Sequence, residues 1–528
     1  MTELSKATRP GDTVEAAGYP PGAGVPKREY DPRLTNEDLA PLREQKWKAY
    51  NIFAFWMSDV HSVGGYVTMG TLFAIGLNAY EVFIALIVGI CIVQFFCNLV
   101  AKPSQQAGVP YPVTCRASFG VLGANIPAII RGLIAVAWYG VQTFLAAESL
   151  NIVFLKLWPG LADWANVDKH GFLGLSYLGY ASYAILWVLQ ALLFQRGMTT
   201  IRKFIDYAGP AVYVVMVAMC LYMLTKVHWD LNLNLSFKDG KHPRSGQLHL
   251  GGMDLVWAMC AAVAAVVSYF SGPMLNFGDF ARYSRDFKSI KRGNVLGLPL
   301  NFIMFSLLTV LTAAATVPLY GELITDPIET VNKIDNTFAI ILGGFTFVVA
   351  TIGINIVANF ISPAFDFSTV APQRISWKMG GMIAAVGSVL VTPWNWYSNT
   401  DAIFWTLGLL GALIGPLFGL LISDFYLIRK QKIVVDDLFT MDPNGTYYYS
   451  KGYNPAAVKA VIISGIISLS SVIIPKVTGT VDWVPKYSWF IGCAAGFVAY
   501  YLLAMAANVA GCADRAKGVV PATAGGTA

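Results

Sequence analysis

The stretch Ser-Asp-Val-His-Ser-Val-Gly-Gly-Tyr, residues 58–66, places a carboxylate, an imidazole and a glycine pair inside a long apolar run. A second apolar run is interrupted at residues 268–276, Ser-Tyr-Phe-Ser-Gly-Pro-Met-Leu-Asn, where Pro273 lacks a backbone N–H. In a bilayer, unpaired backbone is tolerated only where it is buried in protein or lines a cavity. Two interrupted spans at matching positions of two halves indicate a transporter binding site. The alternative is a pair of ordinary kinks, since Gly and Pro are common in membrane helices.

The composition places the whole chain in a membrane. Of its 528 residues, 55% are hydrophobic and only 13% are charged, whereas a soluble protein carries about 25% charged residues. Apolar runs long enough to cross a bilayer as helices recur along the chain. The net charge of +6 is small, and the basic residues sit in short loops, which excludes a nucleic-acid surface. The predicted fold class is an all-α polytopic membrane protein.

We predict about twelve spans, and the interrupted ones are the first and the sixth. That spacing fits two five-span inverted repeats followed by two further spans. The expected spans are 50–76, 80–101, 124–157, 172–195, 204–226, 254–277, 294–318, 336–362, 380–396, 402–428, 456–475 and 487–510. The corresponding units are an N-terminal tail (1–46), a first repeat (47–226), a loop (227–253), a second repeat (254–430), a loop (431–455), two additional spans (456–510) and a C-terminal tail (511–528).

The distribution of Lys and Arg predicts the orientation. Basic residues gather at 196–203, 280–293 and 428–432, and an even number of spans puts these segments on the same side as both termini. The loop at 319–335, on the other side, is acidic. By the positive-inside rule both termini are cytoplasmic, and we expect a multi-pass protein of the cell membrane. The tails read as disordered, with no apolar signal core in the first 46 residues.

Neither a metal site nor an enzyme is expected. The seven cysteines are odd in number, lie mostly in apolar runs and form no CxxC pair, which argues against disulfides and metal ligation. No HExxH, GxSxG or P-loop pattern occurs. We therefore expect no catalytic residues, no metal and no cofactor.

A few polar and aromatic side chains stand out within the spans. Trp138 and Gln142 share one helix face, as do Asn355 and Asn359. The others lie beside the two interruptions and are Ser62, Tyr269 and Phe270. Amides offer a donor and an acceptor on one group, as does the edge of a cyclic amide, and aromatic faces can stack on such a ring. With no cationic residue expected nearby, the group suits a small neutral flat heterocycle. The alternative is that the amides only hold helices together.

The chain resembles the nucleobase:cation symporter-1 family, which carries hydantoins, allantoin, cytosine and uracil. The resemblance covers roughly residues 40–510 and rests on six ordered motifs: "FWMSDVHSVGGY", "GVPYPVTCRASFG", "WYGVQT", "NFGDFARY", "NIVANFISPAFDF" and "GPLFGLLISDFYLIRK". It implies a LeuT-like fold of five plus five inverted spans and two further helices. It also implies alternating access, in which a bundle of spans 1, 2, 6 and 7 rocks against a scaffold of spans 3, 4, 8 and 9.

The family's substrate site maps onto the same residues. Its span-3 aromatic and glutamine fall on Trp138 and Gln142, and its span-8 asparagine falls on Asn359, with Asn355 one turn earlier. The second stacking residue falls on Phe270, where the hydantoin carrier has tryptophan, and Ser62 stands in place of a glutamine. The smaller Phe270 ring suits a pyrimidine and puts a bulky substituted hydantoin in doubt.

The family's sodium site is where the sequence departs most. The carbonyl positions fall on Ser58, His61 and Ala350, but the two hydroxyl positions fall on Gly353 and Ile354, which have no side-chain oxygen. Either other oxygens complete a sodium site or protons drive transport, and we favour protons. The candidate proton carriers are Asp59 and His61, since ionisable residues within spans are functional by default. Capping or gate pairing is the alternative role for both.

The expected function is cation-coupled import of a nucleobase or a related planar heterocycle by a monomer. Uracil is the first choice, followed by hydantoin, allantoin and cytosine. The alternatives are a channel-like facilitative carrier and a transporter-like nutrient sensor. Asp279 and Arg282 are expected at the cytoplasmic interface, and Glu148 is given no role.

Overall fold

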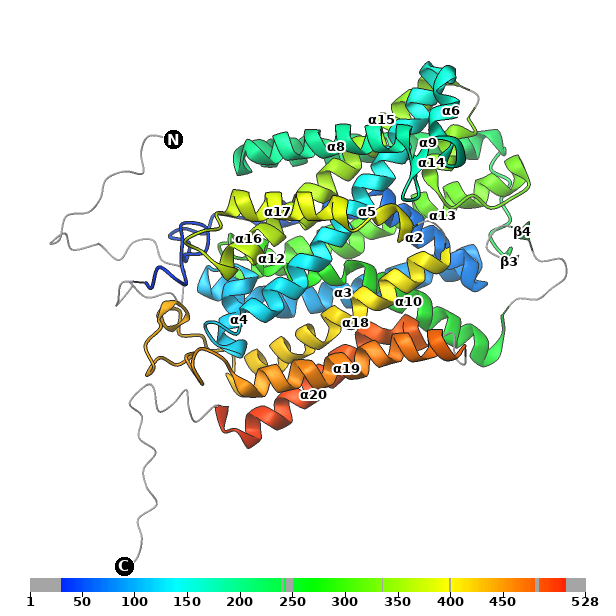
Figure 1. The fold of residues 1–528 in the computed structure, drawn as a ribbon. Helices are drawn as coiled ribbons and strands as arrows, with labels where there is room; N and C mark the ends of the chain where they lie inside the picture. The colour runs from blue at the N-terminus through cyan, green and yellow to red at the C-terminus, as the bar shows by residue number, and fades with distance from the viewer. Residues whose placement is uncertain are drawn as a thin grey trace, which may run out of the picture.

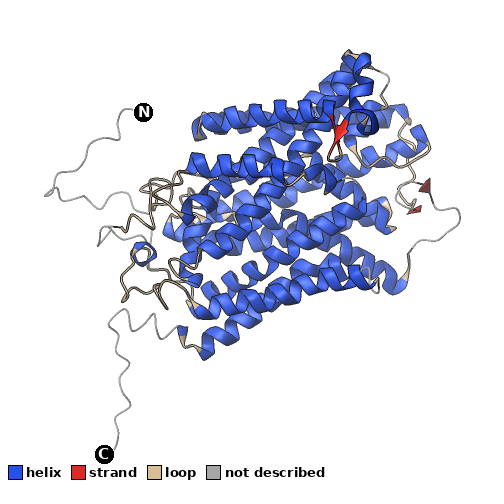
Figure 2. Cartoon of the chain, viewed as in Figure 1, coloured by secondary structure: helices blue, strands red, loops and turns tan. Residues whose placement is uncertain are grey.

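The computed structural model describes residues 30–238, 242–243, 250–334, 336–397, 400–479 and 484–509 (Figure 1). Nearly all regular structure is helical, and the two short antiparallel strand pairs lie in loops (Figure 2). Most of both predicted tails, residues 1–29 and 510–528, lies outside the described residues. In chain order, the elements of the first half are α1 (Ala49–Val60), α2 (Val63–Gly70), η1 (Thr71–Ile75), α3 (Ala79–Ala107), α4 (Tyr111–Phe119), α5 (Asn125–Leu157), η2 (Pro159–Leu161), α6 (Ala162–Ala165), α7 (Val167–His170), β1 (Gly171–Phe172), β2 (Leu175–Ser176), α8 (Tyr177–Gln195), α9 (Met198–Lys226), β3 (Phe237–Lys238) and β4 (His242–Pro243).

The second half continues the helical pattern. Three of its segments, η3, η4 and η6, are π-helical turns within or at the end of long helices. Its elements are α10 (Gly252–Leu275), α11 (Gly278–Ala281), α12 (Phe287–Val295), η3 (Leu296–Leu300), α13 (Asn301–Tyr320), α14 (Pro327–Asn332), α15 (Thr337–Ile354), η4 (Asn355–Ile361), α16 (Ser362–Val370), α17 (Trp377–Leu390), η5 (Pro393–Asn395), α18 (Thr400–Ile422), η6 (Ser423–Ile428), η7 (Asp436–Phe439), α19 (Pro455–Thr478), η8 (Val484–Tyr487) and α20 (Ser488–Ala506).

The described part of the chain contains ten helices that are long and apolar enough to cross a membrane. The other two predicted spans are the split first span, α1 to η1, and α17, which has 14 residues. The third span agrees with prediction to within one residue, since α5 runs over Asn125–Leu157. The fourth begins later than predicted, at Tyr177, because residues 171–176 form the hairpin of β1 and β2.

The first span is broken where the sequence predicts it. Helix α1 ends at Val60 and α2 begins at Val63. Between them Ser62 has an extended backbone (φ −120°, ψ 153°), and its Oγ accepts the N–H of Gly65 at 3.0 Å. A serine in this position caps a helix N-terminus by satisfying a donor that has no helical partner. The break is therefore a helix end and a helix start that meet inside the protein.

The sixth span departs from the prediction in detail. Helix α10 continues through Ser271, Gly272 and Pro273, and the interruption comes at Asn276 and Phe277, before α11. The hydroxyl of Ser271 donates to the carbonyl oxygen of Ser268 at 2.7 Å. Pro273 removes the N–H that would bond to the carbonyl of Tyr269, and a membrane helix tolerates this loss where neighbouring helices pack around it.

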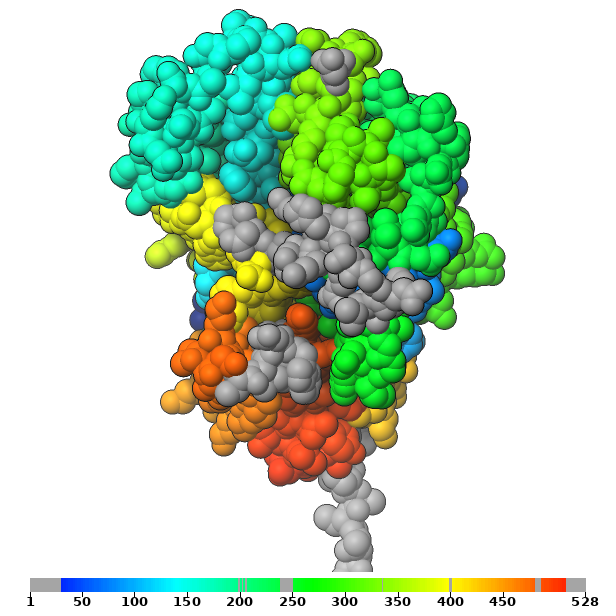
Figure 3. Space-filling view, turned by 90° about the vertical axis from the view of Figure 1, so that its right-hand side faces the viewer, coloured from blue at the N-terminus to red at the C-terminus, as the bar shows by residue number. Residues whose placement is uncertain are grey.

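The long helices form two groups, one around α3 and one around α5. In one group α10 and α13 pack on α3, and α1 packs on α12. In the other group α8, α15, α16 and α17 pack on α5. Helices α18, α19 and α20 pack together at one edge, yellow, orange and red in Figure 1 and yellow to red in Figure 3. These groups correspond to the bundle, the scaffold and the additional helices expected from the sequence.

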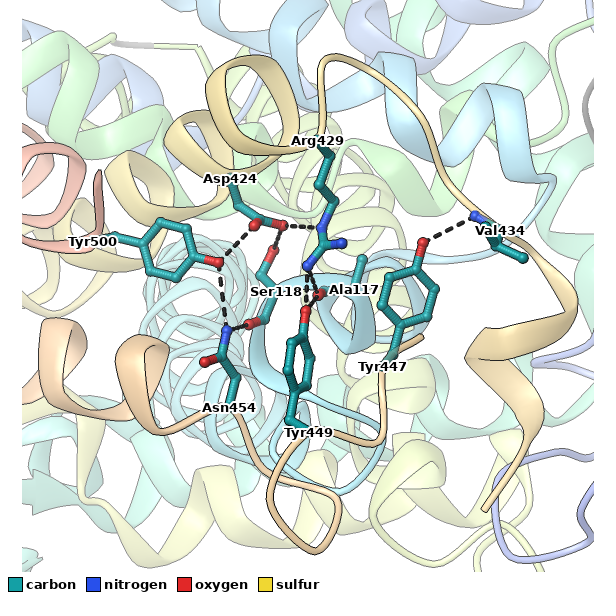
Figure 4. Close-up of polar contacts among 9 residues, drawn as sticks. All are labelled: Ala117, Ser118, Asp424, Arg429, Val434, Tyr447, Tyr449, Asn454 and Tyr500. Atoms are coloured by element: carbon teal, nitrogen blue, oxygen red, sulfur yellow. Dashed lines mark hydrogen bonds and ion pairs between the residues drawn. The ribbon is translucent and has the colours of Figure 1, made fainter. Parts of the chain in front are cut away.

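Residues 30–48, η7 and the end of α20 lie at one end of the molecule, which we call the tail end (Figure 1). A buried carboxylate, Asp424 of η6, holds this end together (Figure 4). It accepts hydrogen bonds from Arg429 Nε at 2.7 Å, Ser118 Oγ at 2.7 Å and the Tyr500 hydroxyl at 2.6 Å. Asn454 donates to the Ser118 carbonyl at 2.6 Å. The carboxylate thus links α18, α4 and α20.

The close packing of α18 on α20 can be tested by adding a methyl group at the contact between the two helices. A Cβ at Gly419 would lie 1.9 Å from the carbonyl oxygen of Cys493, whereas a Cβ at Gly465 of α19 would meet nothing within 4 Å. Gly419→Ala should lower the stability of the purified protein in detergent by about 1–3 kcal/mol, as overpacking does. Gly465→Ala is the matched control and should leave thermal unfolding unchanged or raise it slightly, because Ala favours helix. Equal unfolding temperatures for the two variants would contradict this packing.

Candidate functional site

Three spans bring aromatic and polar groups together near the middle of α5. The rings of Trp138 and Tyr269 lie edge to face, with centroids 5.4 Å apart and planes at 81°. Gln142 Nε2 donates to the Tyr269 hydroxyl at 3.2 Å, and that hydroxyl lies 3.0 Å from Ser62 Oγ. All four side chains are less than a tenth exposed. The break of the first span, α5 and α10 therefore converge on one closed polar and aromatic group.

The amide of Gln142 lies against the backbone of α2. A Cβ on Gly64 would stand only 2.7 Å from Gln142 Nε2 and 2.9 Å from its Oε1, so only glycine allows this approach. Gln142 Oε1 is buried and accepts no hydrogen bond from the residues that the structure describes. A buried acceptor without a donor is costly, so this oxygen is suited to receive a donor from a ligand.

The two asparagines have different surroundings. Asn355 Nδ2 lies 3.2 Å from the Tyr139 carbonyl, 3.0 Å from Thr143 Oγ1 and 2.8 Å from Gln190 Oε1. Its Oδ1 accepts from Asn359 Nδ2 at 2.9 Å. Asn355 is thus occupied by α5 and α8, and it positions Asn359. Both lie on the π-helical turn η4, a feature frequent at functional sites.

Phe270 is oriented differently from the stacking partner predicted for Trp138. Its ring contacts Tyr269 at 5.2 Å and Phe302 of α13 at 5.6 Å between centroids. The rings beside Trp138 are Tyr269 and, at 5.9 Å, Tyr397. The hydroxyl of Tyr397 is hydrogen-bonded to Thr68 of α2. Sequence reasoning missed Tyr397, which follows η5 in a loop where no motif marks it; a stacking role for Phe270 stays a prediction.

A buried cation lies close to the site, contrary to the sequence-based expectation. Arg131 of α5 is 1% exposed; its Nε donates to the Gly272 carbonyl at 3.4 Å and its Nη2 to the Ala358 carbonyl at 3.3 Å. These carbonyls belong to the sixth and eighth spans. Arg131 precedes Trp138 by seven residues, about 10 Å along a helix. The sequence did contain a signal for this cation, because Arg131 is the one arginine inside the apolar run 124–157.

The positions of the sodium site are only partly brought together. Ser58 Oγ lies 3.0 Å from where a Cβ on Gly353 would stand, so the first and eighth spans touch there. Ala350 and Ile354 are buried on α15. The His61 ring faces Tyr66 through Nδ1 and Asn301 through Nε2, each at 3.2 Å.

Asp59 is the one carboxylate within the first span, and it forms no hydrogen bond with the described residues. It is 1% exposed, and both of its oxygens are without a hydrogen-bond partner among the described residues. Glu148, by contrast, accepts from Asn151 Nδ2 at 3.2 Å on the same helix.

Comparison with known proteins places this geometry in context. Residues 40–492 match the family described as permease for cytosine/purines, uracil, thiamine and allantoin. The chain is 33% identical over 477 residues to the allantoin permease of Bacillus subtilis, covering 89% of this chain and 93% of the relative. It is 29% identical to the purine-uracil permease of Arabidopsis thaliana, covering 90% and 76%.

A solved structure shares the fold. It is a nucleobase-cation-symport-1 family transporter in a closed conformation with bromovinylhydantoin bound. The TM-score is 0.72 at 22% identity, and the match covers 92% of this chain and 100% of that one. The fold is therefore the all-α, polytopic, LeuT-like transporter fold.

The structural role of Asn355 can be tested by comparing its substitution with that of Asn359. Asn355→Ala removes the partner of Gln190 Oε1 and of Asn359 Nδ2, so stability should fall by about 1–2 kcal/mol, the range for polar contacts between membrane helices. Thermal unfolding of the purified protein measures this loss. Asn359→Ala removes the hydrogen bond from Asn359 Nδ2 to Asn355 Oδ1 and serves as control, with a smaller loss of stability. A larger loss for Asn359→Ala would show that Asn355 is not the structural member of the pair.

Proposed function

We propose, since this chain belongs to the nucleobase:cation symporter-1 family, that it imports a small planar cyclic ureide by proton-coupled alternating access. The chain is a multi-pass membrane transporter of the nucleobase type and not an enzyme. A cyclic ureide is a ring in which N–H donors alternate with carbonyl acceptors. Uracil, hydantoin and allantoin share this edge.

The observation that carries the proposal is the pairing of Trp138 with Gln142 opposite the break of the first span. The indole offers a face on which a flat ring can stack. Gln142 Oε1, which accepts no bond within the described chain, can take an N–H of the ring, and its Nε2 can turn from Tyr269 to a ring carbonyl. Asn359, held by Asn355, presents a second amide one helical turn away. A dry site with these groups suits a neutral heterocycle.

The substrate choice lies within this class. We keep uracil first, because the Phe270 ring is small and packs against α13 rather than over Trp138. Allantoin is the strongest rival, because the relative from Bacillus subtilis is an allantoin permease. Hydantoin and cytosine carry related edges and rank behind them.

We further propose that protons, not sodium ions, drive the uptake. Gly353 and Ile354 supply no hydroxyl where a sodium ion would need oxygen ligands. Asp59 is the better of the two proton candidates, since its oxygens have no partner in the described chain while His61 is engaged by Tyr66 and Asn301. The tail end, with the basic segments, is assigned to the cytoplasm, and the monomer is the proposed unit.

Competition for uptake tests the substrate and the ion together. Cells that express the chain take up labelled uracil against unlabelled uracil, allantoin, hydantoin and cytosine, with and without sodium and with a protonophore. We expect inhibition by cyclic ureides, independence from sodium, and collapse with the protonophore. A requirement for sodium would contradict proton coupling, and uptake of labelled allantoin but not uracil would reverse the order of substrates.

Two substitutions test the site itself. Trp138→Ala should reduce saturable uptake about 5- to 150-fold, since stacking of a base on an aromatic ring contributes about 1–3 kcal/mol. Gln142→Ala should reduce it by a similar factor, because a hydrogen-bonding group of the substrate would be left buried without a partner, at a cost of about 1–3 kcal/mol. The matched control is Trp164→Ala, at a side chain that is 51% exposed outside the site, and it should transport normally. Surface labelling checks that all three variants reach the membrane. Normal uptake by either site variant would remove that residue from the substrate site.

A further inference from the structure

A pair of buried carboxylates lies between the substrate site and the tail end. Asp366 of α16 and Asp279 of α11 both accept a hydrogen bond from one amide nitrogen, Asn276 Nδ2, at 3.2 Å and 3.0 Å. All three residues are completely buried. Asp366 follows Asn359 by seven residues, about 10 Å along the helix. Asn276 lies at the end of the sixth span, in the expected bundle, and Asp366 lies on the eighth span, in the expected scaffold. The amide of Asn276 thus joins the bundle, which we call the moving group, to the scaffold.

The two carboxylates receive unequal numbers of donors. Asp279 also accepts the backbone N–H of Tyr111 at 2.8 Å. Asp366 accepts only the Asn276 amide, and its Oδ1 has no partner in the described chain. Asp424 shows the contrast, since it receives three donors and one of them is Arg429 (Figure 4). Asp366 therefore lacks the donors that stabilise a buried negative charge.

The charged neighbours of Asp366 do not replace the missing hydrogen-bond donors. Asp366 is faced by Asp279 from α11, Arg131 from α5, and Tyr111 and Cys115 from α4. Arg131 directs two of its nitrogens to the carbonyls of Gly272 and Ala358, not to a carboxylate.

Asp279 holds the negative charge of the pair. It accepts the Tyr111 N–H as well as the Asn276 amide and is also faced by Arg282, so its carboxylate is better stabilised than that of Asp366. Two carboxylates that share one site do not both ionise, because like charges repel at short range.

A second group without a partner points to a proton. Asn276 Oδ1 is buried and, like Asp366 Oδ1, accepts nothing from the described residues. Its Nδ2 is already within hydrogen-bond distance of both carboxylates. A hydrogen on Asp366 Oδ1 would turn that oxygen from an acceptor without a donor into a donor, whereas the amide oxygen of Asn276 cannot carry a hydrogen at neutral pH.

We propose that Asp366 is a proton-binding residue of the transport cycle, protonated while α10 and α11 contact α16 and deprotonated when that contact opens. The proton is taken up from the side of the substrate site, where Asp59 also neighbours Arg131. On opening, the O–H bond of Asp366 breaks, the proton passes to water at the tail end, and the carboxylate remains. An ionised Asp366 then repels Asp279 and opposes closure until it is protonated again. The inference rests on the proposed proton-coupled transport.

The test separates exchange from uphill transport in proteoliposomes that contain the full chain. Counterflow of labelled uracil, with labelled allantoin in a parallel set, requires the gates to move but no net proton release. Accumulation driven by an imposed pH gradient requires release in every cycle. Asp366→Asn mimics the protonated acid, so it should keep counterflow and lose gradient-driven accumulation. Asp366→Glu, which can titrate, should restore part of the accumulation.

The controls distinguish structure from coupling. Asp424→Asn changes another buried carboxylate, one outside the α10–α16 contact, and should lower thermal stability while the surviving protein still accumulates substrate with the pH gradient. Wild-type accumulation by Asp366→Asn overturns the inference, as does loss of its counterflow together with accumulation. Absence of wild-type counterflow with both substrates refutes the proposed function itself. Wild-type accumulation with a sodium gradient alone leaves transport standing and refutes the role of Asp366.

Discussion

The structure depends on a constraint that the bilayer imposes: the polar groups exposed at the break of the first span must find partners without bulk water. The side chain of Ser62 supplies two of these hydrogen bonds. Its Oγ accepts the N–H of Gly65, which caps α2, and it is bonded to the Tyr269 hydroxyl on the sixth span. The break can exist only where α10 and α5 cover it, so the local backbone and the packing of three spans specify one another.

The same constraint divides the buried amides into two kinds. Asn355 Nδ2 is held by α5 and α8, so this amide group is fixed to the group of helices around α5, and a direct contact of Asn355 with substrate stays a prediction. Gln142 is held by one bond to Tyr269 of α10 and keeps an oxygen without a partner in the described chain. The proposed substrate site would therefore combine a firmly held amide, Asn355, with the Gln142 amide, whose one hydrogen bond can be exchanged for a bond to a ligand.

Much of this arrangement can be predicted from the sequence, and the failures have physical reasons. Helical spans and the first break follow from hydropathy and from polar residues in an apolar run, which are local properties. The position of the second break does not follow, because a proline within a membrane helix does not end that helix where other spans pack around it, and α10 continues to Leu275. The partners of Asn355 and the place of Tyr397 depend on contacts between distant spans, which one sequence does not display.

Arg131 shows how the site and the tail end are connected. Its guanidinium bonds to the backbone of Gly272 in the moving group and of Ala358 in the scaffold, next to Asn359. Displacement of α10 away from η4 breaks at least one of these bonds, and a buried arginine that loses an acceptor must find another anion or water. Its nearest carboxylate neighbours are Asp366, Asp279 and Asp59. Arg131 and Asn276 both bond across the sixth and eighth spans, so under the proposed alternating access one displacement of α10 would alter the hydrogen bonds of the cation together with the contact between Asn276 and Asp366.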